Sequence, residues 1–139
     1  MQPKNTLKTK NHSAYRLNYH IVFVIKYRHK VININVMERM KDIFSDVLSK
    51  WECELTEFGA ETDHVHLLIE AHPSLNLSRL IGNLKTVSAR HIRKEYAEYL
   101  KPFFWKPYFW SRSYAVTTTG GANLEKVKEY VLSQEKPSA

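Results

Sequence analysis

A chain of 139 residues, of which 43% are hydrophobic, can form one domain with a buried core. It has no run of about 18 apolar residues, which excludes a hydrophobic membrane span, and its polar first residues indicate no signal peptide. The single cysteine, Cys53, cannot form an intramolecular disulfide, which fits a reducing compartment, so we expect a cytoplasmic protein. The net charge of +7 favours nucleic acid as a partner.

The N-terminal part of the chain predicts an arm, a strand and a helix. Residues 1–13 are polar and basic and include Lys10, which indicates either a mobile tail or an arm that follows phosphates. Residues 19–25 are almost continuously apolar, which predicts a strand buried on both faces. Apolar residues then recur at helical spacing over residues 36–51, with Asn35 as the expected N-cap.

The most strongly alternating stretch covers residues 62–69 and predicts a strand that forms a hairpin with a preceding strand at 54–60. Side chains alternate between the faces of a sheet, so His64 and His66 share one face and the apolar residues share the other. Two imidazoles at this spacing can converge on one divalent ion. By itself the pair also fits two surface histidines.

Basic and aromatic residues follow in the next two segments. A helix is expected over residues 77–100, and one of its faces is basic: Arg79, Arg90, Arg93 and Lys94. That face is either solvated or a track for phosphates. Residues 101–110 combine six aromatic residues with lysines and two prolines, which exclude a helix. Such aromatics either stack unpaired bases or fold under a loop as a small core.

The C-terminal part predicts a fourth strand at 112–119, a flexible joint at Gly120-Gly121 and a last helix that begins after Asn123. Tyr130 and Gln134 are four residues apart and therefore lie on one side of that helix, next to its apolar stripe. Lys126 lies one turn before Tyr130 on the same side. We treat residues 122–134 as a hinged helix within a single domain of residues 1–139.

The predicted order, strand-helix-strand-strand-helix-strand, is that of an α+β, ferredoxin-like (RRM-like) fold with an antiparallel sheet and an extra C-terminal helix. Its two long helices pack on one face of the sheet. His64 and His66 would then point to the other face, and the last helix could cover that face. We expect this placement to bring Tyr130 and Gln134 to the two histidines.

These motifs resemble those of a known family. Residues 63–68, DHVHLL, resemble the His-hydrophobe-His motif of HUH endonucleases, and residues 130–134, YVLSQ, resemble the Tyr-x-x-x-Gln motif of their single-tyrosine transposases. YHIVF at 19–23, KYR at 26–28 and WSRSY at 110–114 also look like blocks of this family. The chain is therefore similar, over residues 19–134, to transposases of the insertion sequence 200/605 family.

The resemblance implies a reaction and its residues. Tyr130 would be the nucleophile, and His64, His66 and the amide oxygen of Gln134 would hold Mg²⁺ or Mn²⁺. The products would be a 5′-phosphotyrosine and a free 3′-OH, with Lys126 as a support for the nucleophile or the phosphate. The implied substrate is single-stranded DNA with hairpins at the ends of the element, and the implied assembly is a homodimer whose tyrosine helices can be exchanged. Lys10, Arg112 and the basic helix face are candidate DNA contacts.

Three other interpretations stay open. Rolling-circle initiators and relaxases use the same chemistry but usually carry longer nuclease or helicase domains. A repeat-associated single-tyrosine transposase is a closer alternative. A non-catalytic RRM-like binding module could use the same sheet face, although it would have no use for Tyr130 and Gln134.

Overall fold

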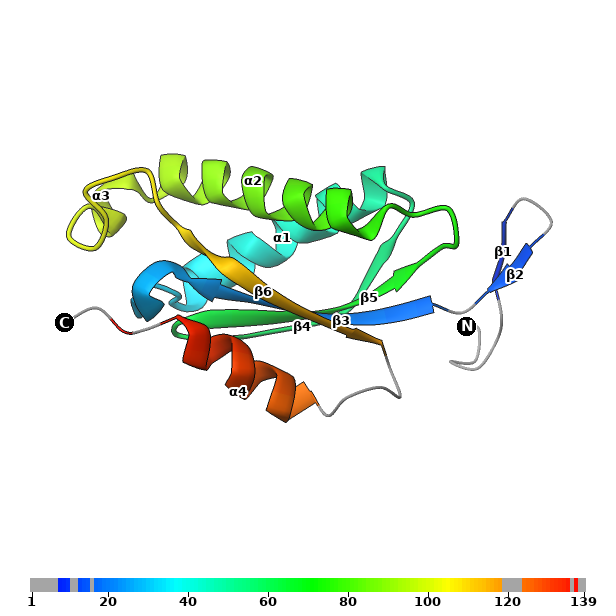
Figure 1. Cartoon of the computed structure of the whole chain (residues 1–139). Helices are drawn as coiled ribbons and strands as arrows, with labels where there is room; N and C mark the ends of the chain where they lie inside the picture. The colour runs from blue at the N-terminus through cyan, green and yellow to red at the C-terminus, as the bar shows by residue number, and fades with distance from the viewer. Residues whose placement is uncertain (1–7, 11–12, 16, 119–123, 136, 138–139) are drawn as a thin grey trace.

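The fold is a four-stranded antiparallel sheet with helices on both faces (Figure 1). It is seen in a computed structural model, which describes residues 8–10, 13–15, 17–118, 124–135 and 137. The strand order is β4-β5-β3-β6. The bounds are β3 Leu17–Ile25, β4 Glu54–Glu61, β5 His64–Ala71 and β6 Trp110–Thr118. This order and the two helical connections confirm the predicted ferredoxin-like arrangement.

The sequence of the central strand β3 is almost entirely apolar because both faces of the strand are buried. Ile21, Phe23 and Ile25 belong to the large core under the two long helices. Val22 and Val24 belong to a second, smaller core on the other face, where they pack with Val131 of the last helix. The predicted strand buried on both faces is thus confirmed, and the sheet has a helix layer on each side.

The first layer contains α1 (Ile34–Lys50) and α2 (Leu77–Glu95), and α4 (Leu124–Gln134) lies on the opposite face (Figure 1). The N-cap of α1 is Asn33, whose side chain accepts a hydrogen bond from the Val36 N–H at 2.9 Å. The prediction of Asn35 as the cap was therefore wrong by two residues: the extended backbone of Asn33 lets its side chain reach the first free N–H groups of the helix.

Further differences from the predicted elements concern their boundaries and short added elements. The strand predicted over 62–69 is β5 at His64–Ala71, and the strand predicted over 112–119 is β6 at Trp110–Thr118. The helix expected over 77–100 divides at Tyr96, whose non-helical backbone separates α2 from the short α3 (Ala97–Leu100). Part of the predicted arm forms a hairpin of β1 (Lys8–Lys10) and β2 (Ser13–Tyr15). A short 3-10 turn, η1 (Lys26–Arg28), follows β3. The joint at Gly120-Gly121 and the expected cap at Asn123 lie outside the described residues.

Within the described ranges, none of the helices has the length and apolar character that crossing a membrane requires.

Candidate active site

His64 and His66 lie side by side on the sheet face that α4 covers. In the antiparallel register, His64 is opposite Val24 and His66 is opposite Val22, and paired residues point to the same face. Both valines contact α4 through Val131. The prediction that His64 and His66 share one face of the sheet is therefore confirmed. This face is the one covered by α4, the helix that carries Tyr130.

The ring of His64 is buried and held in one orientation. Its Nδ1 lies 2.8 Å from Oδ1 of Asp63, and the other oxygen of that carboxylate accepts a hydrogen bond from Arg28 Nε at 3.1 Å. With Nδ1–H donating to the carboxylate, the lone pair of the neutral ring is at Nε2. Nε2 is buried and has no hydrogen-bond partner among the described residues. A carboxylate behind an imidazole is the usual support of a metal-binding histidine.

His66 is half-buried, and its ring lies against Gly59 of the neighbouring edge strand. A Cβ atom built on Gly59 would lie 2.2 Å from Nε2 of His66, so the missing side chain makes the space that the ring occupies. Burial lowers the pKa of His66, and the nearby Lys128, His64 and His20 lower it further, while Glu125 opposes them. A lowered pKa favours the neutral imidazole, which is the form that binds metal ions.

The two histidines fit two positions of a divalent-ion site but do not complete one. Over the part of the chain that the structure describes, there is no group of three or more His, Cys, Asp or Glu side chains that could hold a metal ion. Glu61 Oε2 is 3.8 Å from His64 Nε2, which is too long for a hydrogen bond. A third protein ligand must therefore be of another type or come from elsewhere, and an amide oxygen such as that of Gln134 is chemically suitable.

The docking of α4 places its apolar stripe and Lys128, rather than Tyr130, on the side that packs against the sheet. Lys128 is on the sheet side, only 13% exposed, and its charge acts on His66. Residues two positions apart in a helix point in directions about 200° apart. Tyr130 therefore does not share the sheet side with Lys128 and is 66% exposed, and Gln134 is exposed as well. The apolar stripe and Lys128 occupy the side of α4 that packs on the sheet, and the expectation that Tyr130 and Gln134 meet the histidines of the same chain stays a prediction.

Comparison with known proteins identifies this arrangement. The family described as "Transposase IS200 like" matches residues 13–134. The chain belongs to the IS200-like transposase family. The ISDra2 transposase TnpA of Deinococcus radiodurans is 32% identical over 121 residues, which cover 87% of this chain and 86% of that protein. The transposase of insertion sequence element IS200 from Salmonella typhimurium is 28% identical over 127 residues, 91% of this chain and 82% of that protein.

Solved structures agree with the family assignment. A crystal structure of a Deinococcus radiodurans protein assigned as a transposase has a TM-score of 0.82 at 27% identity and covers 94% of this chain and 99% of its own. A REP-associated tyrosine transposase bound to a REP hairpin has a TM-score of 0.56 at 9% identity, over 88% of this chain and 68% of its own. The second likeness shows the fold alone. As an IS200-like transposase, this chain is an enzyme that acts on DNA.

The predicted DNA contacts of this transposase lie on several surfaces. The basic residues of α2 belong to the helix layer on the far side of the sheet from the histidines: Arg79, Arg90, Arg93 and Lys94. Arg112 is exposed on β6, and Lys126 is exposed on α4. Lys10 is in β1, and its side chain lies outside the described part. The structure therefore does not gather the predicted basic residues at one site.

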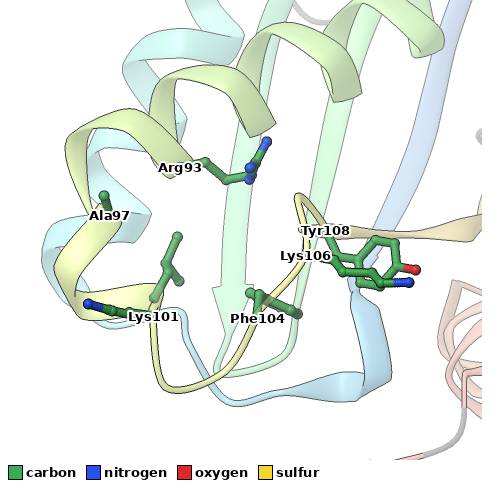
Figure 2. Close-up of a pocket in the computed structure, with 7 residues that line it drawn as sticks. Arg93, Ala97, Lys101, Phe104, Lys106 and Tyr108 are labelled. Atoms are coloured by element: carbon green, nitrogen blue, oxygen red, sulfur yellow. The ribbon is translucent and has the colours of Figure 1, made fainter.

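One of these residues, Arg93, lines a cavity of about 170 Å³ at the aromatic loop before β6 (Figure 2). Lys106 and Tyr108 of that loop line the same cavity, and Phe104 stands beside them. Within the loop region Trp105 is 86% exposed, whereas Phe109 and Trp110 are core residues. Each of the two interpretations therefore fits a different part of the aromatic segment. Phe109 and Trp110 at its end belong to the core, whereas Trp105 and Lys106 in its middle lie at the surface, where they could contact bases.

Sequence reasoning missed the residues that support the histidines. Asp63 directly precedes His64, and a carboxylate next to a candidate metal ligand was a usable signal. Arg28 and Lys128 had no local signal, because their partners are far away in the sequence. The role of Gly59 in making space for the His66 ring can be recognised only from the strand register, which pairs the two residues.

Changing Gly59→Ala is expected to weaken binding of Mn²⁺ by about 10- to 100-fold, the loss typical of disturbing the support of a ligand. The new methyl group would overlap the His66 ring, so the imidazole must move. Isothermal titration calorimetry measures the effect. Gly82→Ala is the matched control, since a Cβ there meets nothing within 4 Å. Equal Mn²⁺ affinity in both variants would show that His66 binds no metal at its present position.

Proposed function

We propose that this transposase cuts and rejoins single-stranded DNA through a covalent tyrosine intermediate. The observation that carries the proposal is the orientation of His64, whose Nε2 is buried without a described partner and directed by Asp63. That atom lies on the sheet face covered by the helix of Tyr130. A buried imidazole nitrogen that is oriented by a carboxylate can bind a metal ion. In a transposase, this supports metal-assisted cleavage of a phosphodiester.

In the proposed reaction, the Tyr130 hydroxyl gives its proton to water and its oxygen attacks the scissile phosphorus. The bond from phosphorus to the 3′ oxygen breaks, and that oxygen takes a proton from water, which leaves a 5′-phosphotyrosine and a free 3′-OH. A divalent ion, Mg²⁺ or Mn²⁺, held by His64, His66 and Gln134 would polarise the phosphate and stabilise the charge on the leaving oxygen. Lys126 is on the tyrosine side of α4 and can favour the phenolate or the phosphate. The phosphotyrosine keeps the bond energy, so a later 3′-OH can rejoin strands without ATP.

The proposed substrate has folded hairpins at the ends of the element. The REP-associated relative was solved with a REP hairpin, and the shared fold supports a similar ligand here. The surface rings and cations around Trp105 suit unpaired bases, because stacking works with any base. The proposed active assembly is a homodimer, since Tyr130 faces outward and could complete the site of a partner.

The experiment that tests this function is a covalent-adduct assay. Purified protein is mixed with a labelled hairpin-bearing single strand, with Mg²⁺, Mn²⁺ or a chelator, and resolved on a denaturing gel. The proposal requires an adduct that depends on the metal. Strand binding without an adduct under every condition would contradict it and would favour the RRM-like binding module.

Replacement of either metal-site histidine, His64→Ala or His66→Ala, is expected to reduce Mn²⁺ binding to the detection limit of calorimetry and to remove cleavage. Each change deletes one of only two imidazole ligands. His91→Ala is the control, because His91 is on α2, near Glu95, and away from this face. Circular dichroism checks that each variant folds. Unchanged Mn²⁺ binding in both site variants would move the metal elsewhere.

Strand binding is expected to weaken steeply with salt and to prefer single strands. The chain has a net charge of +7, and three phosphate contacts to a single strand would lower affinity by about twentyfold between roughly 50 and 200 mM salt. Fluorescence anisotropy with a hairpin-bearing strand and with a plain duplex makes the comparison. Equal affinity for the two would argue against recognition of unpaired bases.

A further inference from the structure

The C-terminal end of α4 is tied to the sheet by a carboxylate. Glu135, directly after the helix, accepts a hydrogen bond from the backbone N–H of Tyr27. Its other oxygen accepts a hydrogen bond from the Ser111 hydroxyl at 2.5 Å. Tyr27 belongs to the turn after β3, and Ser111 belongs to the start of β6. Two donors from separate segments therefore converge on one anionic group.

The Tyr27 donor comes from an unusual turn. Tyr27 and Arg28 have φ values of 61° and 54°, in the left-handed region that residues with side chains seldom adopt. Strained backbone of this kind is concentrated at functional sites. In other proteins, left-handed residues in turns can point main-chain N–H groups at one anion, including phosphate.

The Ser111 donor is built into the fold. Ser111 is 2% exposed, and its Oγ accepts a hydrogen bond from the Ser113 N–H at 3.2 Å. Because that bond uses an acceptor position, the hydroxyl hydrogen is available to an anion. Lys85 Nζ donates to the Ser111 carbonyl at 2.7 Å and holds this part of the strand. The Ser111 oxygen is thus held in place by its own strand.

These donors are next to the candidate active site. Ile25, two residues before Tyr27, donates its N–H to the Asp63 carbonyl at 2.9 Å. Arg28 of the same turn binds the Asp63 side chain that orients His64. Lys26 Nζ lies 5.2 Å from the ring centres of Tyr27 and Tyr108, which adds a cation to the surroundings. An anion held here would be a near neighbour of His64.

We propose that the Tyr27 N–H and the Ser111 hydroxyl form a binding site for one backbone phosphate of the DNA strand, which Glu135 occupies in the free chain. A phosphodiester has one negative charge and two free oxygens, as a carboxylate does, and accepts the same charge-assisted hydrogen bonds. The proposal rests on the proposed function, since the strand must reach the face of His64. A phosphate and Glu135 compete for the same donors, so strand binding releases the C-terminal end of α4.

The test compares two variants that each remove one negative charge from the same region, Glu135→Ala and Glu129→Ala. Glu129 is exposed on α4 and serves as the charge control. Binding of fluorescein-labelled oligothymidylate is measured by anisotropy, in the Tyr130→Phe protein so that no covalent step contributes. Removal of the competing carboxylate is expected to tighten binding about fivefold, and the control less than about twofold.

Ser111→Ala is then added to the Glu135→Ala protein. Loss of one hydrogen bond to a charged group is expected to weaken binding about tenfold. In the same protein, the amide signal of Tyr27 should shift when the oligonucleotide is titrated, as followed by ¹H–¹⁵N NMR.

Three outcomes would overturn the phosphate site: equal effects of Glu135→Ala and Glu129→Ala, no loss on adding Ser111→Ala, or an unmoved Tyr27 amide. Each can occur while wild-type protein still forms the covalent adduct, in which case the proposed function stands without this site. If no adduct forms but these binding effects appear, the phosphate site stands and the strand-cleavage proposal fails.

Discussion

Tyr130→Phe is expected to abolish the covalent protein–DNA adduct completely while strand affinity stays within about twofold of the wild type. The change removes one hydroxyl, the proposed attacking group. The nearby Ser133 hydroxyl of α4 donates its hydrogen to the Tyr130 carbonyl at 2.7 Å. Tyr130 is largely exposed, so the phenyl ring leaves the small core around Val131 undisturbed. Denaturing gels detect the adduct, and anisotropy measures the affinity.

The matched controls for this prediction are Tyr114→Phe and Tyr108→Phe. Tyr114 is partly exposed on β6, and Tyr108 lies at the aromatic cavity (Figure 2). Both controls should form the adduct as the wild type does. An adduct from the Tyr130→Phe protein would place the nucleophile elsewhere, and loss of the adduct in one of the controls would identify that residue as the next candidate.

Most of the fold could be predicted because its signals are local. The apolar run of β3 and the alternation in β5 reflect burial on two faces and on one face, and both are visible in short windows. The errors in the fold were at the ends of helices and strands, where several nearby residues could start or end the element. Asn33 and Asn35 can both cap a helix, and only the backbone at Asn33 decides between them. The break between α2 and α3 at Tyr96 could not be predicted, because no glycine or proline lies there.

The site could be predicted only in part, because alternation gives the face of a side chain but not the rotation of a docked helix. The shared face of His64 and His66 follows from a period of two. Which side of α4 meets that face depends on the whole stripe, including the stem of Lys128, which lies largely buried against the sheet. The hydrogen bond from Arg28 to Asp63, which holds the carboxylate behind His64, joins residues 35 positions apart. Such long-range contacts leave no pattern in a single sequence.

The outward position of Tyr130 leads to the second large effect, recovery of cleavage when two inactive proteins are mixed. His64→Ala protein keeps its tyrosine but has lost a ligand, and Tyr130→Phe protein keeps both histidines but has lost the nucleophile. Each alone is expected to be inactive. If tyrosine helices are exchanged in a dimer, the mixed dimer contains one site with both histidines and one tyrosine, and cleavage returns.

The expected size of the recovery follows from counting. Free exchange at equal concentrations makes about half of the dimers mixed, and each mixed dimer has one complete site of two, so about a quarter of wild-type activity should return by mass action. Exchange is verified first with two affinity tags. If α4 instead turns to serve its own chain, every site in the mixture lacks either a histidine or the tyrosine, and no activity returns. That result would refute helix exchange but leave the metal ligands and the nucleophile as proposed, and Tyr130 would then have to reach His64 by rotation of α4, with Lys128 leaving the sheet side.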